Sequence, residues 1–353
     1  MFDKLIGTGT RAVPGKLCRM VSRRAPDSPG RGVISRSGRP SRGAALLALL
    51  VLCAAAASAQ TRPAPETLRV AALPVTNYTP LVVARDKGWF AEENLNVSWT
   101  LVNQGGIVVE AVYGGSAEIG GTAVFEPMVA RGNGLDLMFV AASARIRSTP
   151  PDNSALLVRA DDSVKSAADL RGKRVSAGLL NGVNHVHLVE WLQRRNVDPA
   201  SVQFLEIPFP QMADALFQNR LDAVWNVEPF VSFMNRTGKA RVLAYPYQDN
   251  IPGMDITSYI AKESWLKTHA DSARRFKRAI DRATDFLVKA SKEERDSWVV
   301  KYSGMKPEVV AGINLPEFTT EFNVPSLRAN LDLAIRHKMV AKPFDVGIML
   351  WKP

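Results

Sequence analysis

Apolar runs of strand length alternate with amphipathic, helix-like stretches from about residue 68 onward. The first run, Leu68–Leu73, has the character of a buried strand, and Pro74 ends it. Thr79-Pro80 then places a capping residue and a proline where a helix begins, and we predict that helix over 81–92 with a break at Lys87-Gly88. Before residue 145 the alternation predicts strands over 95–102, 117–119 and 135–141, a turn over 120–122, and helices over 104–111 and 123–130.

The same alternation restarts after a stretch rich in Pro, Ser and Asn at 148–154. It predicts strands over 155–158, 174–177, 202–207, 222–225 and 241–244, with helices over 166–170, 186–195, 212–218 and 229–233. Beyond about residue 258 the pattern becomes helical. There Phe276, Ile280, Ala283 and Leu287 fall at helical spacing, with basic residues on the opposite side.

Repeated strand–helix units of this length predict an α/β fold, with parallel sheets covered by helices on both faces. Because two such patterns follow one another, we expect two α/β lobes. Lobe 1 is predicted over 60–147 and, as a returning helical part, over 258–353, and lobe 2 over 148–257. The chain would then cross between the lobes twice, near 148–154 and near 250–253.

The N-terminal region has the three parts of an export signal. An apolar run of 14 residues, 44–57, follows an arginine-rich stretch and precedes Ala57-Ser58-Ala59. The run is too short to span a bilayer, which needs about 20 residues. We therefore predict that residues 1–59 are a cleaved signal, with the cut between Ala59 and Gln60, and that the protein is exported.

Removing this segment changes how the composition is interpreted. The whole chain has a net charge of +11, but residues 1–59 contain ten Lys or Arg and two Asp or Glu. The remainder therefore has 35 basic and 32 acidic residues, a balance that gives no reason to expect a nucleic-acid partner. Both cysteines, Cys18 and Cys53, precede the cut, which excludes disulfides, thiolate nucleophiles and cysteine-based metal sites from the exported part.

Several motifs occur in an order that is similar to one known family. They are Lys87-Gly88-Trp89-Phe90, Glu110-Ala111-Val112-Tyr113-Gly114-Gly115, Ala117-Glu118-Ile119-Gly120, Ser166–Val175, and Leu221–Trp225 with Glu228-Pro229. The chain resembles periplasmic substrate-binding proteins of ABC importers, in the family that binds sulfonates, taurine, nitrate or thiamine-pyrimidine precursors. Members often have Gly-Ser before a His-containing helix, and here Asn181-Gly182 stands at that place.

The resemblance implies a type II periplasmic-binding-protein fold, in which two α/β lobes joined by a two-segment hinge close over one ligand. It also implies a monomer in the periplasm, a small-molecule solute, an inner-membrane ABC permease with its ATPase, and no cofactor. The ligand class implied first is an alkanesulfonate or taurine-like anion. The alternative is a thiamine-pyrimidine precursor or other aromatic solute.

Four segments between a predicted strand and a predicted helix are candidates for ligand contacts. In open α/β sheets ligands bind beyond the carboxyl ends of strands, where helix N-termini favour negative charge. Rings could wall such a cleft, and an acid could pair with a ligand amine. The candidates are Asn77, Tyr78, Thr79, Gln104, Gly105, Gly121, Thr122, Gly182, Asn184, His185, Trp225 and Glu228. The alternative interpretation is that the polar residues are helix caps and the rings are core.

Catalytic and metal-binding patterns are absent from the sequence. It has no Gly-x-Ser-x-Gly elbow, no Gly-Lys-Ser/Thr phosphate loop and no Gly-x-Gly-x-x-Gly fingerprint. His185 and His187 are two residues apart and would not share a helix face, so we predict no metal site. The resemblance includes an enzyme branch that makes pyrimidines, which depends on a cysteine-rich motif missing after Ala59. We therefore predict a binding protein rather than an enzyme.

Overall fold

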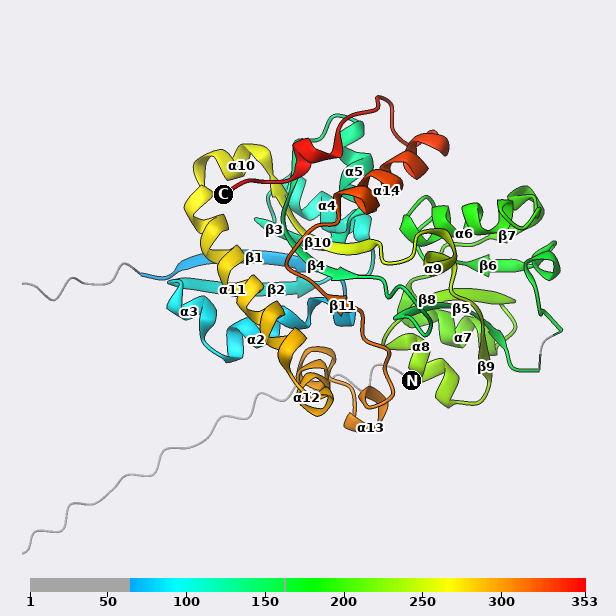
Figure 1. The fold of residues 1–353 in the computed structure, drawn as a ribbon. Coiled ribbons are helices and arrows are strands. Elements are labelled where there is room, and N and C mark those ends of the chain that lie inside the picture. The colour runs from blue at the N-terminus through cyan, green and yellow to red at the C-terminus, as the bar shows by residue number, and fades with distance from the viewer. Residues whose placement is uncertain (1–63, 162) are drawn as a thin grey trace, which may run out of the picture. The chain divides into compact units, whose positions relative to one another are not determined.

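The computed structural model describes residues 64–161 and 163–353. The predicted signal region and its cleavage between Ala59 and Gln60 lie outside the described residues. Residues Pro65–Pro353 form one compact unit that contains two separate sheets (Figure 1). Of the helices described, none combines the length and apolar character needed to cross a membrane.

The larger sheet has six strands in the order β11-β4-β10-β3-β1-β2. Its strands are β1 (Glu66–Ala72), β2 (Leu95–Leu101), β3 (Ile119–Ala123), β4 (Leu137–Arg145), β10 (Asp255–Lys262) and β11 (Glu317–Phe318). Strand β1 is parallel to β2 and β3, whereas β10 is antiparallel to both β3 and β4. The sheet is therefore mixed rather than wholly parallel, because a strand from late in the sequence is inserted at its centre.

The smaller sheet has five strands in the order β7-β6-β8-β5-β9. They are β5 (Ser154–Arg159), β6 (Arg174–Ser176), β7 (Gln203–Phe204), β8 (Ala223–Val227) and β9 (Ala240–Ala244). The chain crosses from the larger sheet after β4 and returns to it after β9. We call the larger sheet with its helices lobe 1 and the smaller sheet with its helices lobe 2. The residue boundaries expected for the lobes from the sequence stay predictions.

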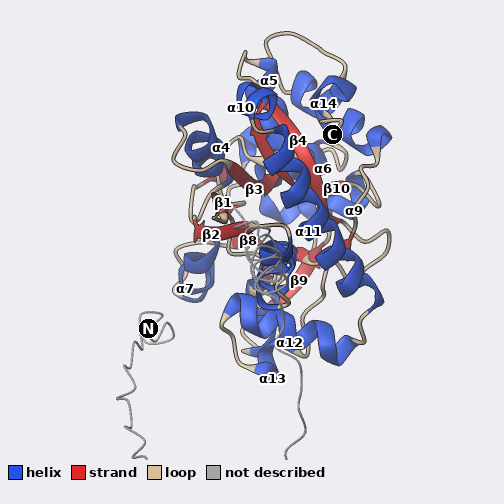
Figure 2. Cartoon of the chain, turned by 90° about the vertical axis from the view of Figure 1, so that its left-hand side faces the viewer, coloured by secondary structure: helices blue, strands red, loops and turns tan. Residues whose placement is uncertain are grey.

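Helices cover both sheets, and Figure 2 shows them on several sides of the strands. In lobe 1 they are α2 (Thr79–Asp86), α3 (Trp89–Glu92), α4 (Gly105–Gly114), α5 (Phe125–Gly132), α10 (Glu263–Thr268), α11 (Ala270–Lys289), α12 (Lys292–Ser303), α13 (Pro307–Val310) and α14 (Val324–Arg336). In lobe 2 they are α6 (Val183–Gln193), α7 (Met212–Phe217), α8 (Phe230–Arg236) and α9 (Pro246–Asn250).

The apolar stripe predicted on the long helix is confirmed. Phe276, Ile280, Ala283 and Leu287 are all fully buried on α11. Phe276 stacks on Phe90 of α3, with ring centroids 5.8 Å apart. Burial of this face fixes α11 against lobe 1, since helices gain most of their stability from packing an amphipathic face.

Two predictions of local structure are wrong. Residues 120–122 are part of strand β3 rather than a turn. The glycines there allow close packing: a Cβ at Gly120 would come within 2.7 Å of Val108 Cγ1, and one at Gly121 within 2.8 Å of Tyr78 Cε1. The helical character expected beyond residue 258 is also wrong until Lys262, because β10 occupies 255–262. A strand buried on both faces has no alternating pattern that would reveal it.

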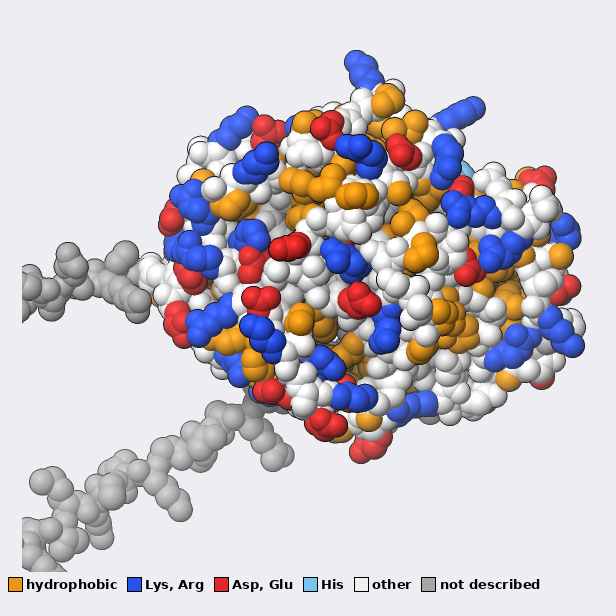
Figure 3. Space-filling view, in the orientation of Figure 1, with side chains coloured by type: hydrophobic (Ala, Val, Ile, Leu, Met, Phe, Trp, Pro, Cys, Tyr) orange, Lys and Arg blue, Asp and Glu red, His pale blue; other side chains and the backbone are white. Residues whose placement is uncertain are grey.

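Charged side chains are mixed over the visible surface. Figure 3 shows Lys and Arg interspersed with Asp and Glu on the face seen in Figure 1, without a large region of one sign. On α11, for example, Arg278 pairs with Glu93 at 2.6 Å and Arg275 with Glu66 at 2.5 Å. The mixture of charges on this face agrees with the nearly equal numbers of basic and acidic residues in 60–353.

Candidate ligand-binding site

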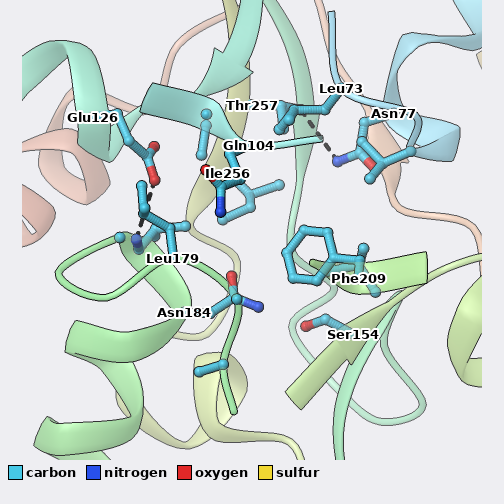
Figure 4. A pocket seen from close by; sticks show the side chains of 18 of the residues that line it. Leu73, Asn77, Gln104, Glu126, Ser154, Leu179, Asn184, Phe209, Ile256 and Thr257 are labelled. Atoms are coloured by element: carbon cyan, nitrogen blue, oxygen red, sulfur yellow. Dashed lines mark hydrogen bonds between the residues drawn. The ribbon is translucent and has the colours of Figure 1, made fainter. Parts of the chain in front are cut away.

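A cavity of about 70 Å³ lies between the two sheets and takes its lining from both lobes (Figure 4). Lobe 1 supplies residues that follow the carboxyl ends of β1, β2 and β3, and lobe 2 supplies residues that follow β6 and β7. This is where α/β sheets bind ligands, because the strand ends and the helix N-termini leave polar backbone groups there. The polar and aromatic side chains of the lining include Asn77, Gln104, Glu126, Asn153, Asn184, Phe209 and Tyr247.

Hydrogen bonds cross from lobe 1 to lobe 2 around this cavity. The Val183 backbone N–H, in the first turn of α6, donates to Glu126 Oε1 at 3.1 Å. Gln104 Nε2 donates to Glu206 Oε1 of lobe 2 at 2.9 Å. Within lobe 2, the backbone N–H of Leu180 donates to Glu206 Oε2 at 3.2 Å. The lobes are therefore in contact through two carboxylates, Glu126 of lobe 1, which accepts the Val183 N–H of lobe 2, and Glu206 of lobe 2, which accepts the Gln104 side chain of lobe 1.

Glu126 is the one charged side chain of the cavity lining among the described residues; no Lys, Arg or His lines it. It lies in the first turn of α5, directly after β3. Burial raises the pKa of its carboxyl, and the hydrogen bond from the Val183 N–H opposes this only in part. Its Oε2 is buried and has no hydrogen-bond partner in the protein. The cavity thus contains a desolvated acceptor that no protein donor satisfies.

Amide side chains supply the other polar groups. Asn77 Nδ2 donates to Thr257 Oγ1 at 3.2 Å, and Asn153 Nδ2 donates to Asn77 Oδ1 at 3.1 Å. The Tyr247 hydroxyl donates to Asn184 Oδ1. Two atoms of these amides are buried without a partner, Asn153 Oδ1 and Asn184 Nδ2. A ligand could satisfy both, because one is an acceptor and the other a donor.

The structure brings together five of the predicted site residues around this cavity. Asn77, Gln104 and Gly105 come from lobe 1, and Gly182 and Asn184 from lobe 2. Gly105 begins α4 and Gly182 is the N-cap of α6, so the prediction that helix N-termini face the cleft agrees with their positions. Their role in binding a ligand stays a prediction.

Four predicted residues of lobe 1 lie behind the cavity rather than on its wall. The ring of Tyr78 is fully buried, packs edge-on against Tyr259 at 5.4 Å, and its hydroxyl donates to the Ser258 carbonyl at 3.4 Å. The Thr79 hydroxyl donates to the Thr76 carbonyl. Gly121 and Thr122 are buried in β3, with Gly121 beneath the Tyr78 ring. The alternative interpretation, that these residues belong to the core, describes their positions.

The remaining three predicted residues are in lobe 2, away from the lining. His185 packs against Phe204 at 4.6 Å, and its Nδ1 accepts the Asn181 N–H. Trp225 is fully buried behind Tyr247, 4.4 Å from it, so Tyr247 is the ring that reaches the cavity.

Glu228 is also fully buried and has protein partners for both oxygens. Its Oε1 accepts from Ser232 Oγ at 2.7 Å and from the Asn314 N–H at 3.1 Å, and its Oε2 accepts the Ser232 N–H at 3.0 Å. It therefore attaches the segment after α13 to lobe 2 and has no free oxygen for a ligand amine.

Reasoning from the sequence missed Glu126, Phe209 and Tyr247. Glu126 had a usable signal, because it is an acid in the first turn of a helix that follows a strand. Phe209 and Tyr247 belong to a 3-10 turn and to the short helix α9, where no periodic pattern marks a site. Within the residues that the structure describes, no group of three or more His, Cys, Asp or Glu is arranged to hold a metal ion.

This arrangement can be compared with known proteins. A family model described as "NMT1/THI5 like" matches residues 75–294, which is more than half of the chain. The chain belongs to this family. The matched residues contain every strand of both sheets except β1 and the short outer strand β11.

Relatives of this NMT1/THI5-like chain include binding proteins and enzymes. It is 22% identical over 273 residues to the taurine-binding periplasmic protein of Escherichia coli K12, covering 73% of this chain and 82% of that one. It is 22% identical over 268 residues to a 4-amino-5-hydroxymethyl-2-methylpyrimidine phosphate synthase of Uromyces fabae, covering 70% of this chain and 73% of that one.

The fold is that of the periplasmic binding proteins. The crystal structure of the periplasmic aliphatic sulphonate binding protein SsuA from Escherichia coli matches with a TM-score of 0.66 and 22% identity, covering 81% of this chain and 98% of that one. At this identity the match establishes the fold alone. It confirms the predicted type II fold, with two α/β lobes joined by two crossing segments.

Proposed function

We propose that this protein is the exported solute-binding component of an ABC importer, which captures a small organic solute by closing two lobes over it. The observation that carries the proposal is the cavity between the lobes, which is lined from both sides and bordered by hydrogen bonds that Glu126 and Glu206 accept from the opposite lobe. A ligand that contacts both lobes favours the closed state in proportion to its differential affinity for it. The name of the taurine-binding periplasmic relative supports the same function.

The proposal includes a periplasmic location after cleavage at Ala59, a monomer, and delivery to an inner-membrane permease with its ATPase. The two crossing segments, after β4 and after β9, would act as the hinge. We propose binding rather than catalysis, since the lining formed by the described residues offers no nucleophile–base pair. Turnover of a candidate ligand by the purified protein would contradict this part.

The first ligand class is a sulfonate or taurine-like anion. Its support comes from the relatives' names and from α4, whose N-terminus begins at Gly105 on the cavity wall and favours negative charge. The opposing feature is the absence of Lys and Arg from the described lining, together with the presence of Glu126.

A thiamine-pyrimidine precursor or other aromatic solute is the second candidate. Here the favourable observations are the rings of Phe209 and Tyr247 and the unpaired amide atoms of Asn153 and Asn184, which suit a ring with hydrogen-bonding edges. The relationship to a pyrimidine phosphate synthase supports this class as well.

Thermal unfolding of residues 60–353 with a ligand panel tests the function. The panel contains alkanesulfonates, taurine and aminopyrimidines. A ligand at 100 times its Kd adds about 2.7 kcal/mol to the free energy of unfolding, a rise in Tm of at least about 2 °C. X-ray scattering should show a smaller radius of gyration with the same compound. If no compound of either class changes Tm or the radius of gyration, the proposal is wrong.

A further inference from the structure

We propose that Glu126 is the specificity-determining residue of the cavity, with one carboxylate oxygen holding the lobes together and the other accepting an N–H of the ligand. The inference rests on the proposed function and narrows its ligand class. Solutes with an amine, amidine or amino-heterocycle group would bind more tightly than matched solutes, such as simple sulfonates, that lack an N–H donor.

The two oxygens of Glu126 differ in their surroundings. Oε1 accepts the backbone N–H of Val183 from lobe 2, a contact that joins the two lobes. Oε2 is buried and has no partner. An ionised oxygen left without a donor inside a protein is costly, so a donor from a ligand would stabilise the closed state in which both oxygens are paired.

The residues around Glu126 disfavour an anionic ligand that has neither a cationic group nor an N–H donor. No Lys, Arg or His belongs to the described lining, so nothing there offsets a second negative charge. Burial raises the pKa of the Glu126 carboxyl, and only hydrogen bonds from backbone N–H groups oppose this. A cationic or N–H-bearing group supplies what is missing, and charge-assisted hydrogen bonds are the stronger kind.

The backbone on both sides is shaped around this carboxylate. A Cβ at Gly105 of lobe 1 would lie 3.2 Å from Glu126 Cδ, and a Cβ at Gly182 of lobe 2 would lie 3.4 Å from Glu126 Oε1. Figure 4 shows the Glu126 side chain descending from lobe 1 toward the loop that contains Leu179. Glycine at both positions leaves room for the carboxylate between the lobes.

The side-chain amides of Asn184 and Asn153 add two hydrogen-bonding groups that a ligand can pair with. Asn184 is 4% exposed and its Nδ2 has no acceptor, while Asn153 is 3% exposed and its Oδ1 has no donor. A ligand therefore needs a donor for Glu126 and an acceptor for Asn184. Aminosulfonates such as taurine and aminopyrimidines have both groups, and ethanesulfonate has acceptors only.

Calorimetric titration with two matched pairs of probes tests the inference. The pairs are taurine with ethanesulfonate, and 4-amino-2-methylpyrimidine with 2-methylpyrimidine. We expect one amino compound to bind residues 60–353 about 10- to 100-fold more tightly than its partner, the range of a charge-assisted hydrogen bond. Glu126→Gln should abolish that preference, because its amide can accept the Val183 N–H but turns a donor toward the ligand.

Glu206→Gln is the matched control. Glu206 also accepts a hydrogen bond across the lobes, from the Gln104 side chain, but it is exposed and is not part of the lining. The control is expected to weaken both members of a pair equally and to keep the preference. Equal binding of ethanesulfonate and taurine, or an unchanged preference in Glu126→Gln, would overturn the inference and leave the proposed function in place. Failure of all four probes would contradict the inference and, with a negative full panel, the function too.

Discussion

Glu228 makes the stability of this protein depend on pH in a way that can be measured. Burial raises the pKa of its carboxyl to about 7, above the ordinary 4.5, although hydrogen bonds from Ser232 and from the Asn314 N–H lower it in part. Ser232 Oγ lies near both Glu228 Oε1 and the Gly312 carbonyl, at 2.7 and 3.1 Å. A protonated Glu228 can donate to Ser232 Oγ, whose hydroxyl then donates to Gly312.

The direction of the pH dependence follows from whether the folded or the unfolded chain holds the Glu228 proton. Below pH 4.5 the folded and unfolded chains both carry it, so Glu228 contributes no pH dependence. Between pH 4.5 and about 7 the folded chain keeps the proton and the unfolded chain loses it, so the free energy of unfolding falls as pH rises. A pKa moved from 4.5 to about 7 corresponds to about 3 kcal/mol.

Urea unfolding of residues 60–353 and of Glu228→Gln, from pH 4.5 to 8, measures this effect. The quantity of interest is the free energy of unfolding of the wild type minus that of the variant, because contributions of other titrating groups cancel. We expect this difference to fall by about 3 kcal/mol across the range. The exposed Glu308 of α13 provides a control, and Glu308→Gln should give a difference that is nearly constant with pH. A constant difference for Glu228→Gln would refute the reasoning.

Two further predictions concern the site and a buried histidine. Gly105→Ala would place a methyl group 2.8 Å from Thr122 Oγ1 at the cavity wall, so calorimetry should show weaker ligand binding. The free energy of unfolding should fall by an overpacking cost of about 1–3 kcal/mol, seen as a lower Tm, whereas Gly114→Ala, with no atom within 4 Å, should change neither. Burial lowers the pKa of His187 to about 4, and its hydrogen bond to Asn330 opposes this only in part. The folded chain therefore resists protonation, and stability should be lost as pH falls from about 6.5 to 4, a decline that His187→Gln should lack in urea unfolding.

Much of the fold was predictable because its signals are local. The Thr79-Pro80 pair marks the start of α2, and the stripe from Phe276 to Leu287 defines the buried face of α11. Both depend on the periodicity and end chemistry of a single helix. The start of α4 at Gly105 was likewise predicted, whereas α6 begins at Val183, three residues before its predicted start. Gly105 and Gly182 both line the cavity.

Other features were decided only when distant segments came together. Strand β10 enters the centre of the larger sheet, and its buried residues carry no alternation that the sequence alone could reveal. Tyr247 reaches the cavity while Trp225, the more conspicuous ring, is packed behind it. The free oxygen of Glu126 likewise depends on Val183, 57 residues away, which occupies the other oxygen. The sequence by itself determined most of the secondary structure and the class of fold, because these follow from local periodicity. The tertiary structure alone decided which polar groups are paired and which remain for a ligand, because burial and long-range contacts set that balance.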